Sequence, residues 1–152
     1  MVHPRTSLAA ILVASLAFGA AGAGPGLAKS SKPPFKAGRY DGTVTSSVSG
    51  KEPASRPVSL RVSKVGKGYR LRMTLSVRVT CNNKGHWRKL PFRGVHIDKT
   101  TGVFSGRTSR RYKAWKGTVS GQATGSAITA TWNYLVPDGS CWGNGNVNAT
   151  RG

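Results

Sequence analysis

The chain has 152 residues, of which 24 are Lys or Arg and only four are Asp or Glu, giving a formal net charge of +20. This length is enough for one domain. The imbalance favours polyanionic partners and leaves few carboxylates for acid–base chemistry. The alternative is a general solubility bias of the source, in which the charge has no dedicated partner.

The first 28 residues have the pattern of a secretory signal peptide, which we expect to be helical before it is removed. Arg5 precedes an apolar run over 8–20, and small residues follow. Cleavage after Ala23 and cleavage after Ala28 both fit, and the pattern does not choose between them. Because the run is short for a bilayer span, we expect no transmembrane segment after cleavage. The location is then secreted, the exterior of the cell envelope or the periplasm.

Residues 29–37 are rich in Ser, Lys and Pro and predict a disordered basic linker. An antiparallel β domain over 38–150 follows. Its first predicted strands cover 38–46 and 58–65, with a loop punctuated by Gly and Pro between them.

The strongest pattern lies over 69–81, where apolar and polar residues alternate strictly. A period of two predicts a half-buried strand of unusual length. A tight turn at 66–67 pairs it with the preceding strand, so that Val62 faces Leu71 and Arg61 faces Arg72. Like charges facing each other are unfavourable unless an anion or solvent separates them.

Beyond that strand, 82–89 reads as a polar loop, and a change of parity at Gly94 predicts a β-bulge. A short strand covers 103–108, and a hairpin covers 115–136 with its turn at 124–125. In that hairpin, symmetric pairing sets Gly117 opposite Trp132 and Gly121 opposite Ile128. A last strand covers 141–149.

About eight short strands with frequent turns predict an all-β fold, a single antiparallel meander. Because the first and last strands can pair, a barrel is favoured and a β-sandwich is the alternative. The two cysteines, Cys81 and Cys141, predict one disulfide in an exported chain.

Several segments together resemble a known group of proteins. They are Gly38-Arg39-Tyr40-Asp41-Gly42-Thr43, Pro57-Val58-Ser59-Leu60-Arg61-Val62, Val79-Thr80-Cys81, Gly102-Val103-Phe104-Ser105-Gly106, Lys116-Gly117-Thr118-Val119-Ser120-Gly121 and Cys141. This pattern is similar to small, exported, single-disulfide β proteins of actinobacterial type, which have no assigned function. The resemblance covers most of 38–149 and implies fold and export, but no site residue.

No catalytic, metal or cofactor signature emerges. The segment around Cys141 is similar to a papain-type nucleophile, but no His follows it. His96 and Asp98 share a strand face without a nucleophile elbow, and His86 and His96 do not make a zinc site. Asp41, Glu52 and Asp138 read as turn residues. We therefore expect a protein that is not an enzyme and holds no cofactor.

The basic residues with interleaved aromatics are the remaining candidate site. Guanidinium groups bind phosphate and carboxylate in bidentate fashion, and exposed aromatic rings stack on sugars or bases. The alternative is that they form ordinary solvated faces. The candidates for anion binding are Arg61, Arg70, Arg72, Arg78, Arg88, Arg107, Arg110 and Arg111, with Trp87 and Tyr112 as aromatic contacts.

The sequence thus predicts a secreted binding domain for anionic polymers of the cell envelope or the extracellular space, or for a membrane or wall surface. Export disfavours a specific nucleic acid. The alternatives are a β-barrel that binds a small molecule and a secreted inhibitor or interaction protein. The oligomeric state is left open.

Overall fold

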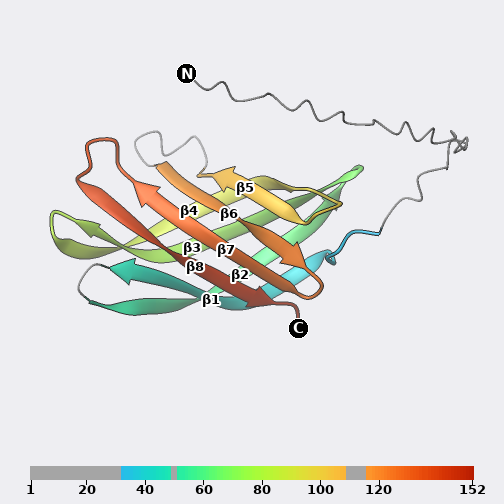
Figure 1. The fold of residues 1–152 in the computed structure, drawn as a ribbon, viewed down its shortest axis with the longest axis horizontal. Helices are drawn as coiled ribbons and strands as arrows, with labels where there is room; N and C mark the ends of the chain where they lie inside the picture. Colours follow the sequence, from blue (N-terminus) through green and yellow to red (C-terminus); the bar gives the residue numbers. More distant parts are fainter. Residues whose placement is uncertain (1–31, 49–50, 109–115) are drawn as a thin grey trace, which may run out of the picture.

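Within the residues that the structure describes, eight antiparallel strands follow one another in chain order and close into a barrel (Figure 1). The computed structural model describes residues 32–48, 51–108 and 116–152. β8 pairs with β1, which closes the sheet. The predicted meander barrel is confirmed, and the predicted signal peptide lies outside the described residues. The strands are β1 (Gly38–Val48), β2 (Lys51–Val65), β3 (Gly68–Cys81), β4 (Lys84–Ile97), β5 (Val103–Arg107), β6 (Lys116–Thr124), β7 (Ala127–Leu135) and β8 (Cys141–Thr150).

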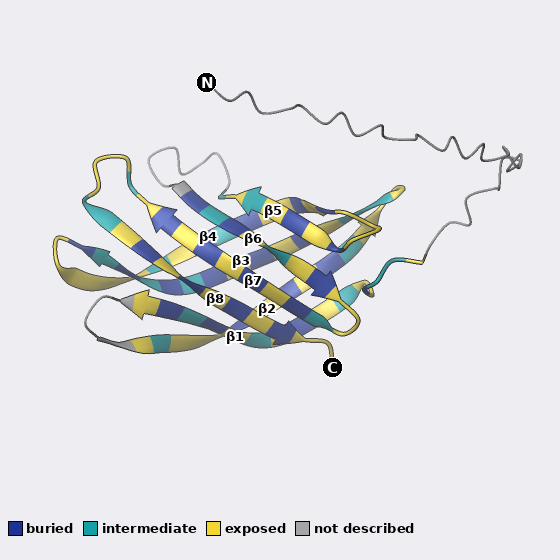
Figure 2. Cartoon of the chain, viewed as in Figure 1, coloured by how far each residue is buried: buried dark blue, intermediate teal, exposed yellow. Residues whose placement is uncertain are grey.

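β3 alternates between the interior and the outside along its whole length (Figure 2). This follows from the two-residue period of a strand, which sends successive side chains to opposite faces. Tyr69, at its start, is partly buried and packs edge-to-face on Phe35. The inward residues are Leu71, Met73, Leu75, Val77, Val79 and Cys81, all of them buried.

Large side chains occupy the interior of the barrel, among them Trp132, Tyr40 and Phe92. Trp132 on β7 reaches beneath β8, and its indole Nε1 donates a hydrogen bond of 2.9 Å to the Thr45 carbonyl on β1. Its register partner on β8 is Gly145, where an added Cβ would collide with that carbonyl and with the indole. The close approach of β7, β8 and β1 therefore requires glycine at this position.

At one end of the barrel β8 changes its partner from β1 to β3. From Asn144 to its end, β8 pairs with β1. At the start of β8, Trp142 pairs with Thr80 and Cys141 with Cys81, both on β3. The predicted disulfide Cys81–Cys141 is present at this junction. The backbone N–H of Arg78 donates a 2.9 Å hydrogen bond to the buried Ser46 hydroxyl on β1. The tip of the β3–β4 hairpin is thus fixed to both β8 and β1.

The predicted register of β2 with β3 is confirmed near their turn. Leu60 pairs with Met73, Arg61 with Arg72 and Val62 with Leu71. The ladder does not continue beyond Leu60, where β2 keeps pairing with β1 alone. The predicted bulge at Gly94 is also confirmed, since the β3–β4 register shifts there and Gly94 has a φ of 67°.

The predicted register of the β6–β7 hairpin is wrong by two residues. Gly117 pairs with Tyr134 and Gly121 with Ala130, because the turn lies at 125–126 instead of 124–125. Such a shift keeps every side chain on its face, so the hydrophobic pattern cannot distinguish the two registers.

Two predicted loops are wrong, because both segments are strand. β1 continues to Val48 and β2 begins at Lys51. Most of the predicted loop at 46–57 therefore belongs to a long hairpin. Likewise β4 begins at Lys84, after a tight turn in which Asn82 and Asn83 both have positive φ. Asparagine tolerates that conformation better than most residues.

The predicted linker extends too far into the domain. Phe35 is 4% exposed, forms a bridge with Gly125 and packs against Tyr69. The Tyr40 hydroxyl also donates a 2.6 Å hydrogen bond to the Lys36 carbonyl. Residues 34–36 therefore belong to the packed domain, because an apolar ring there covers core side chains. In the described part of the chain, no helix is long and apolar enough to cross a bilayer.

Candidate anion-binding surface

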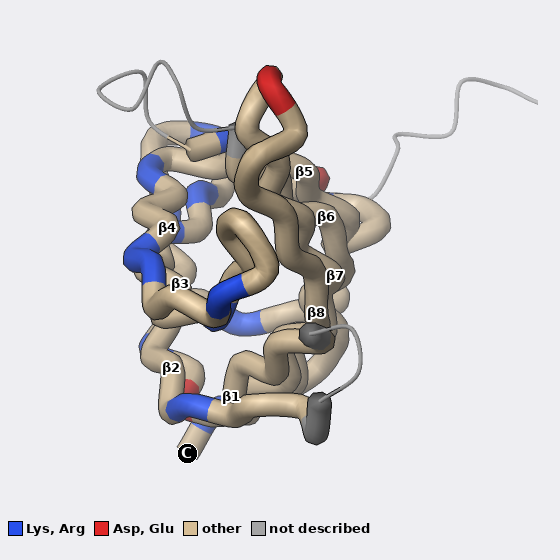
Figure 3. The backbone as a smooth tube through the Cα atoms, turned by 90° about the vertical axis from the view of Figure 1, so that its left-hand side faces the viewer, with Lys and Arg blue, Asp and Glu red and all other residues tan. Residues whose placement is uncertain are grey.

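Positive charge is distributed unevenly over the barrel wall (Figure 3). The sequence places four Lys or Arg residues in β2, three in β3 and four in β4. It places one, Lys116, in β6 and none in β7 or β8. The outward positions of β2, β3 and β4 are therefore the candidate site for anions.

A row of arginines crosses β1, β2 and β3 on the outer face. Arg39 pairs in register with Arg61, and Arg61 pairs with Arg72. All three line a groove of about 610 Å³ together with Pro57 and Thr74. Cross-strand partners lie about 5 Å apart, so these guanidinium groups can act on one ligand together. We call this set the arginine row.

The arginine row has little internal charge compensation. In the described ranges, the single ion pair joins Arg39 Nε to Asp41 Oδ2 at 2.9 Å, and both side chains are solvent-exposed. Exposed pairs of this kind contribute little to stability. Arg61 and Arg72 therefore oppose each other with no carboxylate partner among the described residues.

Arg70 extends the arginine row toward β4. Its Nη1 donates a 3.0 Å hydrogen bond to the carbonyl of Gly94 in the bulge. Arg70, Arg61 and Arg72 together line a second groove of about 270 Å³. The bulge thus provides an acceptor that holds one cation beside the row.

Arg78 and Trp87 form a second cluster nearer the disulfide. They are register partners on β3 and β4, and Trp87 is 42% exposed. The guanidinium carbon of Arg56 on β2 lies 4.0 Å from the centroid of the Trp87 ring, which is a cation–π contact. Arg56 was not among the sequence candidates, and it brings a second cation to this cluster.

Arg88, one of the sequence candidates for anion binding, lies on the opposite face of β4 from Trp87. It shares the inward parity of Leu90 and Phe92, and it is half-buried. Its charge opposes the rise in pKa that burial produces at Tyr134, an inward residue of β7. Arg88 and Trp87 are separated because neighbouring residues on a strand point to opposite faces.

Of the remaining candidates, Arg107 joins neither the arginine row nor the cluster of Arg78 and Trp87. Arg107 is exposed at the end of β5 and pairs with Thr118 of β6. Arg110, Arg111 and Tyr112 lie outside the described residues.

Each aspartate accepts hydrogen bonds from neighbouring residues of its own turn or strand. Hydrogen bonds from the Arg39 side chain lower the pKa of Asp41. The backbone N–H groups of Thr101 and Thr100, each 2.8 Å from Oδ1, lower the pKa of Asp98. Such carboxylates are ionised at neutral pH and are poor general acids. Among the described residues, no group of His, Cys, Asp and Glu could hold a metal ion.

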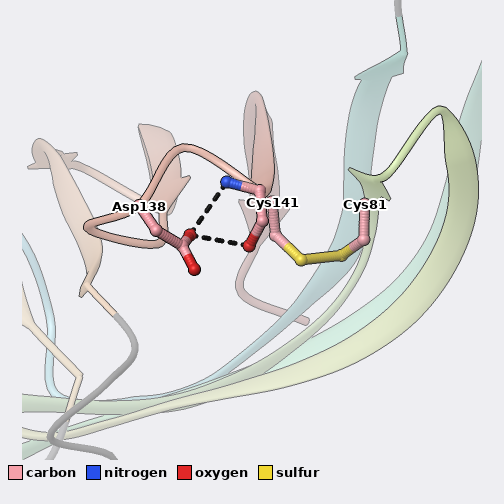
Figure 4. The surroundings of a disulfide bond; sticks show 4 residues. Cys81, Asp138 and Cys141 are labelled. Atoms are coloured by element: carbon pink, nitrogen blue, oxygen red, sulfur yellow. Dashed lines mark hydrogen bonds between the residues drawn. A yellow bond between two sulfur atoms is a disulfide. The ribbon is translucent and has the colours of Figure 1, made fainter.

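Asp138 orders the turn that leads into the disulfide (Figure 4). Its Oδ1 accepts hydrogen bonds of 2.7 and 2.9 Å from the hydroxyl and the backbone N–H of Ser140, and these lower its pKa. The Ser140 carbonyl in turn accepts a hydrogen bond from Asn82. The turn thereby sets Cys141 opposite Cys81.

No protein-family model and no curated protein matches the sequence. The function is therefore inferred from the geometry of the site. Sequence reasoning identified Arg61, Arg70, Arg72, Arg78 and Trp87 but missed Arg39 and Arg56. Pairing the first strand with the second, with Tyr40 beside Leu60, would have identified Arg39. Arg56 reaches Trp87 across the fold, and no local pattern indicates that contact.

Proposed function

We propose that this chain is an exported, non-enzymatic binding domain that holds anionic polymers of the cell envelope or extracellular space on its arginine row. The disulfide is typical of an oxidising compartment outside the cytoplasm. Polymers with repeated phosphate or carboxylate groups, including those of a wall or membrane surface, are the partners of matching chemistry.

The observation that supports this proposal is the direct pairing of Arg61 with Arg72 on an exposed face. Two like charges in register destabilise a sheet unless something separates or neutralises them. An anionic group between them turns the repulsion into two charge-assisted hydrogen bonds. Arg39 and Arg70 on either side extend the surface to successive groups of a polymer.

The alternatives have less support. A small-molecule site inside the barrel would have to displace large buried side chains such as Trp132 and Phe92. An inhibitor that acts through its loops would not account for the pairing of arginines in the middle of a sheet.

The test is the binding of long-chain inorganic polyphosphate to wild-type protein and to the double variant Arg61→Gln/Arg72→Gln. Binding of wild-type protein should weaken steeply between about 50 and 200 mM salt, because it releases counterions. Removing two phosphate contacts should lower the affinity at every salt concentration and reduce the slope of log affinity against log salt by about 2.

The matched control is Lys99→Gln/Arg107→Gln, which removes two exposed positive charges away from the arginine row. It should leave the slope near that of wild-type protein. Equal losses in the two double variants would show that net charge alone attracts the polymer. Binding that does not change with salt would overturn the proposal.

A further inference from the structure

A separate group of side chains lies where β8 changes partner. Trp142 of β8 pairs with Thr80 of β3, which pairs with Gly85 of β4. Register partners share a face, so Trp142 and Thr80 lie on the same side of this small sheet. The disulfide Cys81–Cys141 is the next pair in the ladder and holds the strands together.

Arg78 brings a positive charge to the same face. An added Cβ at Gly85 would lie 2.6 Å from Arg78 Nε and 2.9 Å from Nη2, so the guanidinium lies directly over the glycine. The absence of a side chain at Gly85, beside Thr80, leaves the space that this guanidinium occupies. Arg56 adds a second cation nearby, because it stacks on the ring of Trp87, and Trp87 is the register partner of Arg78.

Two polar atoms in this group find no hydrogen-bond partner in the part of the chain that the structure describes. Arg78 Nε and Thr80 Oγ1 are both shielded from solvent, and neither has a partner among the described residues. Buried polar groups in proteins are usually paired, so an unpaired charged donor beside an unpaired hydroxyl calls for an explanation. An oxyanion bound to the guanidinium would neutralise its charge and accept from a neighbouring hydroxyl.

On the β8 side of Thr80, away from Arg78, Trp142 borders the site. It is 38% exposed, and the next outward residues of β8 are Asn144, Asn146 and Asn148. Their carboxamides donate and accept hydrogen bonds, as sugar hydroxyl groups require. The exposed indole ring of Trp142, followed along β8 by neutral asparagine side chains, is better suited to binding a sugar than a second phosphate.

We propose that the face formed by Trp142, Thr80 and Arg78 binds a sugar phosphate unit, with the phosphate on Arg78 and Arg56 and the sugar on Trp142. The inference rests on the proposed function and narrows it, because it assigns the polymer to the class in which sugars are linked by phosphate groups. The arginine row then holds phosphates further along the same chain.

The experiment compares glucose 1-phosphate, inorganic phosphate and glucose as probes of the intact protein, by calorimetry and by the NMR signals of the tryptophan indole N–H groups. Glucose 1-phosphate should bind roughly tenfold more tightly than inorganic phosphate, the gain expected from one stacking contact. It should also shift the Trp142 indole signal, whereas glucose alone should bind far more weakly.

Two variants separate the parts of the site. Trp142→Ala should remove the preference for glucose 1-phosphate over phosphate, while Val103→Ala, at another exposed apolar residue, should keep it. Arg78→Gln should weaken both ligands. If Arg78→Gln impairs folding, Arg56→Gln at an exposed position replaces it in the test, and it should also weaken the binding of both ligands.

The outcomes distinguish this inference from the proposed function. If polyphosphate binds through the arginine row and glucose 1-phosphate binds no better than phosphate, the sugar phosphate site is wrong and the proposed function stands. If neither polyphosphate nor glucose 1-phosphate binds, the proposed function and the sugar phosphate site are both wrong. Tighter binding of adenosine monophosphate than of glucose 1-phosphate would indicate that Trp142 stacks on a nucleobase, and it would overturn the assignment of a sugar to this site.

Discussion

Two parts of one barrel wall carry opposite surface chemistry. β2, β3 and β4 carry most of the Lys and Arg residues of the strands, whereas β7 and β8 carry none and β6 carries only Lys116 (Figure 3). We call β2–β4 the charged part and β6–β8 the neutral part. The exposed polar residues of the neutral part include Ser120, Gln122, Thr124, Thr129, Thr131, Asn133, Asn144, Asn146 and Asn148, and its exposed apolar residues are Leu135 and Trp142.

The comparison shows that the charge is not a uniform property of this surface. Inward positions of both parts are constrained by packing, while outward positions are not. A general solubility bias would place lysine and arginine on all outward positions alike. Their concentration on β2, β3 and β4 favours a partner on that side, and it leaves the neutral part to pack and close the barrel.

The largest expected effect is on stability and comes from Trp132 in the neutral part. Trp132→Ala should lower the free energy of unfolding by about 4 kcal/mol for the lost ring, and by about 1 kcal/mol more for the unpaired Thr45 carbonyl. Urea denaturation measures the loss. Trp132→Phe keeps most of the ring and should lose clearly less. A small loss for Trp132→Ala would mean that the neutral part does not close the barrel.

The disulfide should have the next largest effect, because it joins β3 of the charged part to β8 of the neutral part. Cys81→Ala/Cys141→Ala opens a loop with a sequence separation of 60 residues. In the chain-entropy model this costs about 4 kcal/mol. Urea denaturation of the variant and of reduced wild-type protein should give similar losses. An unchanged midpoint would show that the β3–β8 junction is held without the bond.

A smaller effect should follow from moving the arginine pair across the barrel. Thr131 and Asn146 are exposed register partners on β7 and β8, as Arg61 and Arg72 are on β2 and β3. Adding Thr131→Arg/Asn146→Arg to the Arg61→Gln/Arg72→Gln variant restores the net charge. The new pair should cost about 0.2–1 kcal/mol through like-charge repulsion.

The same transplant should not restore most of the lost polyphosphate affinity, because Arg39 and Arg70 remain on the other side of the barrel. Calorimetric titration at low salt measures this. Full recovery would mean that any arginine pair on this barrel suffices, and the contrast between the two parts would lose its functional meaning.

The division into two parts could be predicted from the sequence only in outline. The alternation in β3 and the turn at 66–67 predicted which arginines share a face with Arg72. The β6–β7 register could not be predicted, since a two-residue shift leaves the pattern unchanged. The polar start of β4 read as a loop because that strand buries little there. The contact of Arg56 with Trp87 depends on the path of two hairpins, and no local sequence signal encodes it.

The smallest effect concerns pH and the turn at Asp98 between β4 and β5. Hydrogen bonds from Thr101 and Thr100 lower the pKa of Asp98 in the folded state. A depressed folded pKa means that this contribution to stability is present above the unfolded pKa, about 3.9, and is lost as pH falls through the folded pKa. Acid should therefore destabilise wild-type protein below about pH 4.

Asp98→Asn removes this titration and should make the fall in thermal midpoint between about pH 4 and pH 2 shallower. Asp41 and Asp138 also have lowered pKa values and should supply the remaining acid dependence. Asp41→Asn is the comparison within the arginine row, because it also frees Arg39 from its ion pair. Polyphosphate binding at neutral pH should increase slightly for Asp41→Asn and stay unchanged for Asp98→Asn. The reverse order would place the anion-binding surface near the Asp98 turn instead of on the arginine row.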